Sequence, residues 1–149
     1  MSRGFEIISS YQMAEIALPQ RKTRLSAGYD IAAAEDVVLA PQKVTLVPTG
    51  LKAYMENDEY LGIHVRSGLA VKNNVTLINA QGIIDADYYN NDGNEGHILI
   101  AFFNHASQDV LITKGTRIAQ GIFYKYLLAD QDNYQTAEIR KGGLGSTGK

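Results

Sequence analysis

The sequence predicts a single all-β domain, a sandwich or a barrel, and three observations support this fold class. Short runs rich in β-branched and aromatic residues recur along the chain, and clusters of Gly, Pro, Asn and Asp separate them. One segment alone has helical character, and no internal repeat or second domain is visible. A chain of 149 residues can bury its own core, and the absence of cysteine excludes disulfides and thiolate metal sites.

The expected strands follow one another at short intervals. Residues 5–18 fit a strand followed by irregular chain, and residues 19–26 form a polar connection that we expect to be solvated. Asp30 stands at the head of an apolar stretch. Further strands are predicted at residues 37–39, 44–47, 51–54, 60–65, 75–78, 98–103, 110–112 and 118–126. Residues 68–72 resemble a helical turn that the Ser67 side chain can cap.

Composition excludes several classes of partner. The formal net charge of -2 argues against sequence-independent nucleic-acid binding, which needs a basic face, so any phosphate recognition must be local. No apolar run approaches the length of a membrane span, and the first residues lack the regions of a signal peptide. We therefore expect a soluble, cytoplasmic protein that binds neither nucleic acid nor membrane.

The end of the chain changes character. We expect a β domain over residues 1–129 and a mobile, polar and glycine-rich arm over residues 130–149. Residues 143–149 match the spacing Gly-x-x-x-x-Gly-Lys of a phosphate loop, but the next hydroxyl residue and helix are missing, so we reject that interpretation. The glycines, with Ser146, Thr147 and Arg140, could still wrap an anion, although a disordered tail explains them equally well.

Residues 79–89 have the composition of a nucleoside pocket. Asp85 follows Ile83 and Ile84, and removing water from a carboxylate is costly unless the site uses the charge. Gly82 allows a tight bend or the close approach of a ligand. Two further side chains suit a planar ligand: Asn79 offers a donor and an acceptor, and Tyr88 can stack on a ring or exclude a bulky group. A β-hairpin with Asp85 bonded to turn amides remains an alternative.

Two other stretches could bind phosphate. Arg66, Ser67 and Gly68 combine a guanidinium, a hydroxyl and free amides at the start of a helical turn, although a capped turn with a surface arginine is the alternative. Gln120, predicted on the opposite strand face from Arg117, could bind a phosphate oxygen or a metal-bound water, or simply a neighbouring strand. Asp30 caps a turn or orders water around a cation. The three histidines lack carboxylate partners at metal-ligand spacing, so we interpret them as ordinary polar residues.

Taken together, these stretches resemble the five ordered motifs of the trimeric deoxyuridine triphosphatase (dUTPase) family. The motifs are Ala27-Gly-Tyr-Asp-Ile31, Arg66-Ser-Gly-Leu-Ala70, Asn79 with Gly82-Ile-Ile-Asp-Ala-Asp-Tyr88, Arg117-Ile-Ala-Gln120, and Arg140 with Gly143-Leu-Gly-Ser-Thr-Gly148. Each is weak alone, and their order over nearly the whole chain makes the resemblance specific.

The resemblance implies a distorted jelly-roll (β-clip) domain, a homotrimer that exchanges its arms, and Mg2+-dependent hydrolysis of dUTP to dUMP and pyrophosphate. This activity limits uracil incorporation into DNA and supplies dUMP. By resemblance, Asp85 deprotonates the water that attacks the α-phosphorus, and a mostly apolar pocket would raise its proton affinity. Arg66, Ser67, Gly68 and Gln120 would hold the phosphates. The substrate phosphates would hold Mg2+, and Asp30 would reach it only through water.

The resemblance also implies the source of selectivity. Asn79 and the backbone of Gly82, Ile83 and Ile84 would bind uracil without room for a 5-methyl group, and Tyr88 under the sugar would exclude a 2′-hydroxyl. The arm of a neighbouring subunit would close over the nucleotide through Arg140, Leu144, Gly145, Ser146 and Thr147.

Three departures from the family pattern stand out. Leu144 replaces the usual aromatic over uracil, Lys141 stands where a glycine is common, and residues 90–96, from Asn90 to Gly96, form an insertion. We expect the insertion to be an exposed loop that could dock a protein partner.

Three other functions remain open at this point. A dCTP deaminase-type relative would need a glutamate beside the third motif, and none stands there. A dUTPase-like regulator would bind a protein through the insertion with nucleotide as the switch. A purely structural sandwich would have no reason to combine Asp85, Arg66 and Gln120.

Overall fold

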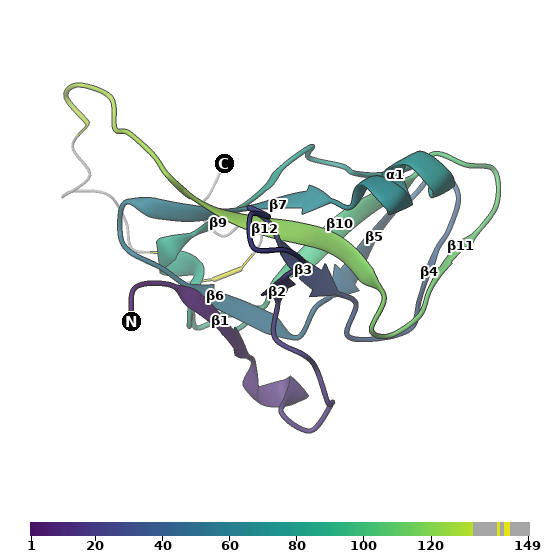
Figure 1. Cartoon of the computed structure of the whole chain (residues 1–149), viewed down its shortest axis with the longest axis horizontal. Coiled ribbons are helices and arrows are strands. Elements are labelled where there is room, and N and C mark those ends of the chain that lie inside the picture. Colours follow the sequence, from purple (N-terminus) through teal and green to yellow (C-terminus); the bar gives the residue numbers. More distant parts are fainter. Residues whose placement is uncertain (133–139, 141, 144–149) are drawn as a thin grey trace.

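The computed structural model describes residues 1–132, 140 and 142–143, and this part of the chain is built mainly from short strands (Figure 1). The strands are β1 (Gly4–Ile7), β2 (Gln20–Arg21), β3 (Tyr29–Ala32), β4 (Val37–Leu39), β5 (Val44–Pro48), β6 (Leu51–Tyr54), β7 (Glu59–Val65), β8 (Val75–Leu77), β9 (Gly82–Asp85), β10 (Leu99–Asn104), β11 (Val110–Ile112) and β12 (Arg117–Lys125). The helical elements are η1 (Ser9–Tyr11), α1 (Ser67–Asn73) and η2 (Ala86–Tyr88).

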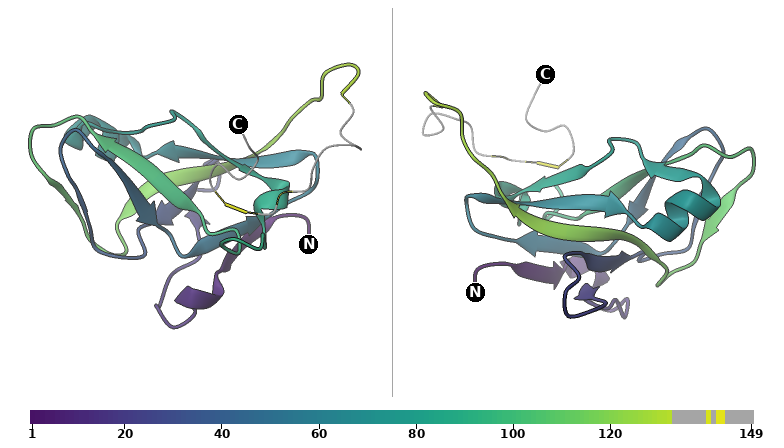
Figure 2. Two further views of the ribbon diagram at one scale, coloured as in Figure 1. Left: turned by 180° about the vertical axis from the view of Figure 1, so that it is seen from behind. Right: turned by 45° about the horizontal axis from the view of Figure 1, so that its top comes forward.

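The largest sheet has the antiparallel order β2-β3-β12-β7-β9, and three smaller sheets, β5-β10-β8, β1-β6 and β11-β4, pack with it around one core (Figure 2). Side chains alternate between the two faces of each strand, so one face of the large sheet points inward. Ile31, Leu61 and Ile63 supply that face, and Phe102 of β10 lies fully buried in the same core cluster. The other face of the large sheet points outward and bears polar residues, among them Asp30, Gln120 and Asp85.

The all-β prediction is confirmed, because the strands at 37–39, 51–54 and 110–112 match the expected ranges residue for residue. The predicted helical turn is α1, but the role given to Ser67 is wrong. Arg66 is the N-cap, in extended conformation, and no side chain caps the helix by a hydrogen bond. Ser67 instead begins the helix and is exposed. Among the described residues, no helix is long and apolar enough to cross a membrane.

The insertion, residues 90–96, is folded against the domain, so the prediction of an exposed loop holds for Asn90, Asp92 and Gly93 but is wrong for two of the other residues. Asn91 and Gly96 are buried. The Asn91 side chain accepts hydrogen bonds from the backbone N–H groups of Gly93 (3.0 Å) and Asn94 (3.1 Å). The polar composition thus serves to close turns within the loop. Binding of a protein partner there stays a prediction.

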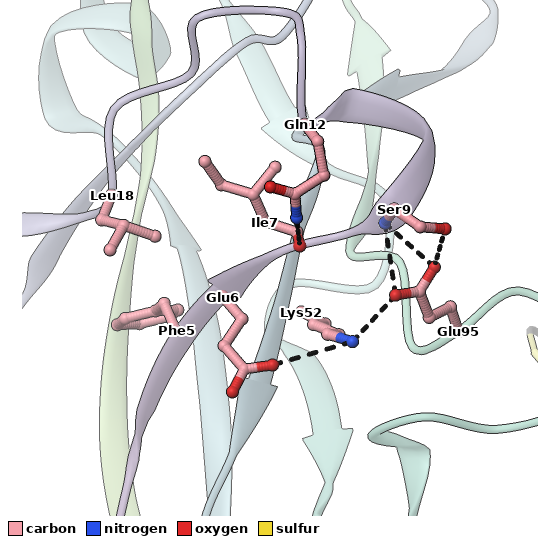
Figure 3. Close-up of a pocket in the computed structure, with 8 residues that line it drawn as sticks. All are labelled: Phe5, Glu6, Ile7, Ser9, Gln12, Leu18, Lys52 and Glu95. Carbon is pink, nitrogen blue, oxygen red and sulfur yellow. Dashed lines mark hydrogen bonds and ion pairs between the residues drawn. The ribbon is translucent and has the colours of Figure 1, made fainter.

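Lys52 of β6 holds the insertion through contacts with two of its residues, Asn90 and Glu95. Its ammonium group donates to Asn90 Oδ1 (2.7 Å) and lies 2.8 Å from Glu95 Oε1, although the residue is only 8% exposed. The backbone N–H and the hydroxyl of Ser9 also donate to Glu95 (Figure 3). These bonds tie the insertion to β6 and η1.

Candidate functional site

Two arginines and a glutamine gather around Asp30 on β3, and we call these four residues the arginine cluster. Arg117 Nη1 of β12 lies 2.9 Å from Asp30 Oδ2, and Arg66 Nε lies 3.5 Å from Asp30 Oδ1. Gln120 is the cross-strand partner of Asp30. The predicted residues of the first, second and fourth motifs therefore meet at one end of the large sheet. Ser67 and Gly68 lie beside them at the start of α1, and both are exposed.

A β-bulge overturns the prediction that Gln120 faces away from Arg117. Arg117 pairs with Ala32 and Ala119 with Ile31, so β12 has one extra residue at that point. The bulge shifts by one position the alternation of β12 side chains between the two faces of the sheet. Both Arg117 and Gln120 then lie on the face of Asp30, which permits the clustering of their side chains.

Gly28 makes room for Gln120. A Cβ atom at Gly28 would overlap Gln120 Oε1 and would lie 3.0 Å from Gln120 Cβ. The glycine of the first motif therefore sets the position of an amide on the neighbouring strand. The motif had suggested no such link.

Asp85 ends β9 on the outward face of the sheet. Its side chain is 50% exposed, so the predicted burial in an apolar pocket is wrong for the isolated chain. Asp85 Oδ2 accepts a hydrogen bond from Arg140 Nη2 at 2.5 Å, and Asp87 accepts one from Arg140 Nε at 3.0 Å. The alternative of bonds to turn amides finds no support among the described residues. Arg140 of the arm is thus the partner of Asp85 in the structure.

The predicted uracil-binding residues line the approach to β9. Asn79 is exposed in a turn in which Ala80 adopts a φ of 61°, a conformation that is strained for alanine. Gly82 begins β9 opposite Ile63, and a Cβ there would lie 3.2 Å from Ile63 Cβ. Ile83 is 59% exposed on the outward face, and Ile84 packs against the core.

Tyr88 is 7% exposed, and both its hydroxyl and its ring contact other residues. Its hydroxyl donates to His97 O (2.8 Å) and accepts from Asn94 Nδ2 (2.8 Å). The guanidinium of Arg140 lies 5.6 Å from the ring centroid, within the range of a cation–π contact. Tyr88 is therefore a rigid platform next to Asp85. Leu144, Gly145, Ser146 and Thr147 lie outside the described residues, as does Lys141.

The arginine cluster and Asp85 do not meet in the single chain. Gln120 lies opposite His64 on β7, whereas Asp85 lies opposite Tyr60, four residues along the same strand. With two strand spacings added, this register separates Gln120 from Asp85 by about 16 Å. Both groups nevertheless lie on the same outward face of the sheet.

Sequence reasoning missed a polar network between these two groups. Gln81 Nε2 lies 3.2 Å from His64 Nε2, which is also 3.1 Å from the Tyr124 hydroxyl. These contacts join side chains from β12, β7 and the residue before β9. In the sequence, only the alternation of inward and outward side chains along β7 could have indicated that His64 faces outward. Asp87, the second carboxylate that Arg140 contacts, was also missed.

The predicted site residues that the structure describes do not line the cavity found in this part of the chain. This cavity is a groove of about 450 Å³ over β1, η1 and β6, where Lys52 and Glu95 form part of its wall (Figure 3). Among the described residues, no group of three or more His, Cys, Asp or Glu side chains could hold a metal ion. The candidate site is thus an open surface in the single chain.

Guanidinium, amide and carboxylate groups displayed on one sheet face define a class of β protein suited to a phosphorylated ligand. Comparison with known proteins makes the class specific. The dUTPase family model matches residues 14–148. The deoxyuridine 5'-triphosphate nucleotidohydrolase of Lactococcus lactis subsp. lactis (strain IL1403) is 50% identical over 146 residues, which cover 98% of this chain and 97% of that protein. The chain belongs to the dUTPase family.

Solved structures agree with this assignment. The crystal structure of the dUTPase from Streptococcus mutans aligns with a TM-score of 0.81 at 44% identity, covering 85% of this chain and 98% of the other. A dUTPase mutant from phage phi11 of S. aureus, which coordinates a structural Mg(II) ion, aligns with a TM-score of 0.73. Its identity of 21% shows likeness of fold alone. The chain therefore has the predicted jelly-roll type of β fold.

Proposed function

We propose that this protein hydrolyses dUTP to dUMP and pyrophosphate, with Asp85 as the base that activates the attacking water. Such an activity would limit uracil incorporation into DNA and would supply dUMP. The observation that carries the proposal is the display of Asp85 and the arginine cluster on one outward sheet face of a chain of the dUTPase family. A half-exposed carboxylate has room for a water and a phosphate beside it.

The site requires more than one chain. Phosphate-binding residues about 16 Å from the base cannot act on one α-phosphorus, so the two groups must come from different subunits. An outward apolar face on the β5-β10-β8 sheet supports self-association. Val44, Leu46 and Ile78 are 51%, 47% and 52% exposed there. The assembly proposed is a homotrimer in which each site draws on neighbouring chains and their arms.

The arginine cluster is suited to the triphosphate. Asp30 holds Arg66 and Arg117 side by side, so their guanidinium groups are oriented before the ligand arrives. Ser67, Gly68 and Gln120 would add hydroxyl, amide and side-chain donors to the phosphate oxygens.

The residues around Asp30 also fit a Mg2+ ion that the substrate phosphates hold. The cluster offers a single carboxylate, already paired with arginines, which suits contact through water and not a direct protein chelate. When bound, Mg2+ would neutralise phosphate charge and help to align the α-phosphorus.

Base and sugar selectivity would come from the third motif. Asn79 and the backbone of Gly82, Ile83 and Ile84 would contact the uracil edge. A lost or gained methyl contact is worth only about 1–3 kcal/mol, so the exclusion of thymine requires a clash with rigid backbone. Pairing of β9 with β7 supplies that rigidity. Tyr88, fixed by two hydrogen bonds, would exclude a 2′-hydroxyl, and Arg140 with Leu144, Gly145, Ser146 and Thr147 would close over the nucleotide.

One assay tests the proposal. The protein is incubated with each dNTP and Mg2+, and only dUTP should yield monophosphate and pyrophosphate. Ammonia release from dCTP would favour the deaminase-type relative instead. Asp85→Asn should still bind dUTP while turnover falls by about 10²- to 10⁴-fold, the usual contribution of a general base. Undiminished turnover would remove Asp85 from its role.

A further inference from the structure

We infer that the insertion is a docking surface for the arm of its own chain, which rests there with Arg140 covering Asp85 until nucleotide binds. The described residues of the arm in this contact are Arg140, Gly142 and Gly143. The inference rests on the proposed function only where it treats Asp85 as the base. The docking itself can be tested without any substrate.

The insertion presents a defined surface because its two ends are held by the ammonium group of Lys52, which lies within hydrogen-bond distance of Asn90 and Glu95. Burial opposes the charge of Lys52, yet its hydrogen bond and attraction to Glu95 outweigh burial and raise the pKa of Lys52. The hydrogen bonds from Lys52 and Ser9 lower the pKa of Glu95 to about 2, so the anchor stays ionised at neutral pH. A loop fixed in this way can present one defined backbone surface.

The contact with the arm is backbone against backbone. A Cβ atom at Gly93 would lie 3.0 Å from Gly142 Cα and 3.3 Å from Gly143 N. A Cβ atom at Gly143 would lie 2.9 Å from Asn94 Nδ2. Glycines on both sides favour this approach, and a Cβ at Gly93 would require the arm to move by only a few tenths of an ångström.

Arg140 completes the contact at its other end. Its side chain is only 14% exposed, since it bonds to Asp85 and Asp87 and lies over the ring of Tyr88. Asn94 links the two halves, because it touches Gly143 and also donates to the Tyr88 hydroxyl. In this position Arg140 is ion-paired with Asp85, the carboxylate that should activate water. Nucleotide phosphates would compete for the guanidinium and free Asp85.

A disulfide trap tests the docking directly, because the chain contains no cysteine. The pair Gly93→Cys and Gly142→Cys is chosen because a Cβ at Gly93 would lie 3.0 Å from Gly142 Cα, so the two backbones are close enough for a disulfide to form after a small shift. Mild oxidation should give an intramolecular bond, seen on a non-reducing gel as a faster monomer band and in mass spectra as a 93–142 linked peptide. The control pair is Lys72→Cys with Gly142→Cys, because α1 lies at the opposite end of the molecule (Figure 1).

Each outcome decides the matter. Failure of the 93–142 pair to link faster than the control overturns the docking, and a dimer-sized product shows that the arm docks on a neighbour and overturns the own-chain position. The trapped protein should hydrolyse dUTP at least tenfold more slowly than after reduction. Equal rates would overturn the resting role of Arg140. Absence of dUTP hydrolysis in the untrapped parent would refute the proposed function and leave the cross-linking result intact.

Discussion

Restoration of activity from two inactive chains is the sharpest consequence of the separated site groups. Asp85→Asn removes the base and Arg66→Ala removes part of the arginine cluster, so each variant alone should be nearly inactive. If each site takes Asp85 from one chain and Arg66 from the next, a mixed trimer of either composition has one intact site.

The size of the effect follows from symmetry. A site in a randomly mixed trimer is intact only when one given chain keeps Asp85 and the next keeps Arg66. An equal mixture therefore recovers about a quarter of the wild-type rate. A site built within one chain would recover nothing, since every chain in the mixture lacks one of the two groups. The separation of about 16 Å between the two groups is what excludes the single-chain site.

The assay is steady-state pyrophosphate release after co-unfolding and refolding of the two variants. The matched control mixes wild type with the double variant Asp85→Asn, Arg66→Ala in equal amounts. A shared site predicts about a quarter of the wild-type rate for this control also, whereas a single-chain site predicts about half. Zero recovery in the first mixture together with half in the control would refute the shared site.

Three further changes give separate expectations. Gly28→Ala should displace Gln120 and lower kcat by roughly 10²-fold with little loss of stability, and unchanged kinetics would remove Gln120 from the phosphate site. Lys52→Met should lower the urea midpoint of unfolding, because it removes the cation that binds Asn90 and Glu95 and leaves, among the described residues, only Ser9 as donor to that carboxylate, whereas Lys125→Met at an exposed pair should cause no measurable change. Burial lowers the pKa of His97 from 6.5, so the unfolded chain binds the proton more readily and stability should fall as the pH drops below 6.5. His97→Asn should flatten this dependence of stability on pH. An unaltered dependence would mean that another group causes it.

Much of the fold could be predicted because its signals are local. The strands at 37–39, 51–54 and 110–112 lie between clusters of turn residues that the sequence shows directly. The motif residues Arg66, Asp30 and Gln120 could be named for a similar reason, since each belongs to a short motif of adjacent residues. The alternation of apolar residues says which face is buried, and it needs no knowledge of the neighbouring strand.

What could not be predicted depends on long-range contacts. The bulge that turns Arg117 and Gln120 to one face depends on how β12 pairs with β3. The insertion is polar in composition, yet Lys52, far away in the sequence, holds its Glu95. A single sequence gives no sign of such a pair, because a lysine in a strand and a glutamate in a loop are each ordinary surface residues. For this reason the sequence predicted an exposed loop, whereas in the structure Lys52 holds the loop against the domain.

The exposure of Asp85 leads to a final prediction. Half of the Asp85 side chain is in contact with water, and catalysis by proton transfer improves when the site excludes bulk water. Among the residues that the structure describes, only Arg140 pairs with this carboxylate, so we expect further cover from a neighbouring chain and the nucleotide. Dilution that dissociates the assembly should therefore abolish hydrolysis while the circular dichroism of the β domain persists. Full specific activity in a species shown by light scattering to be monomeric would contradict this reasoning.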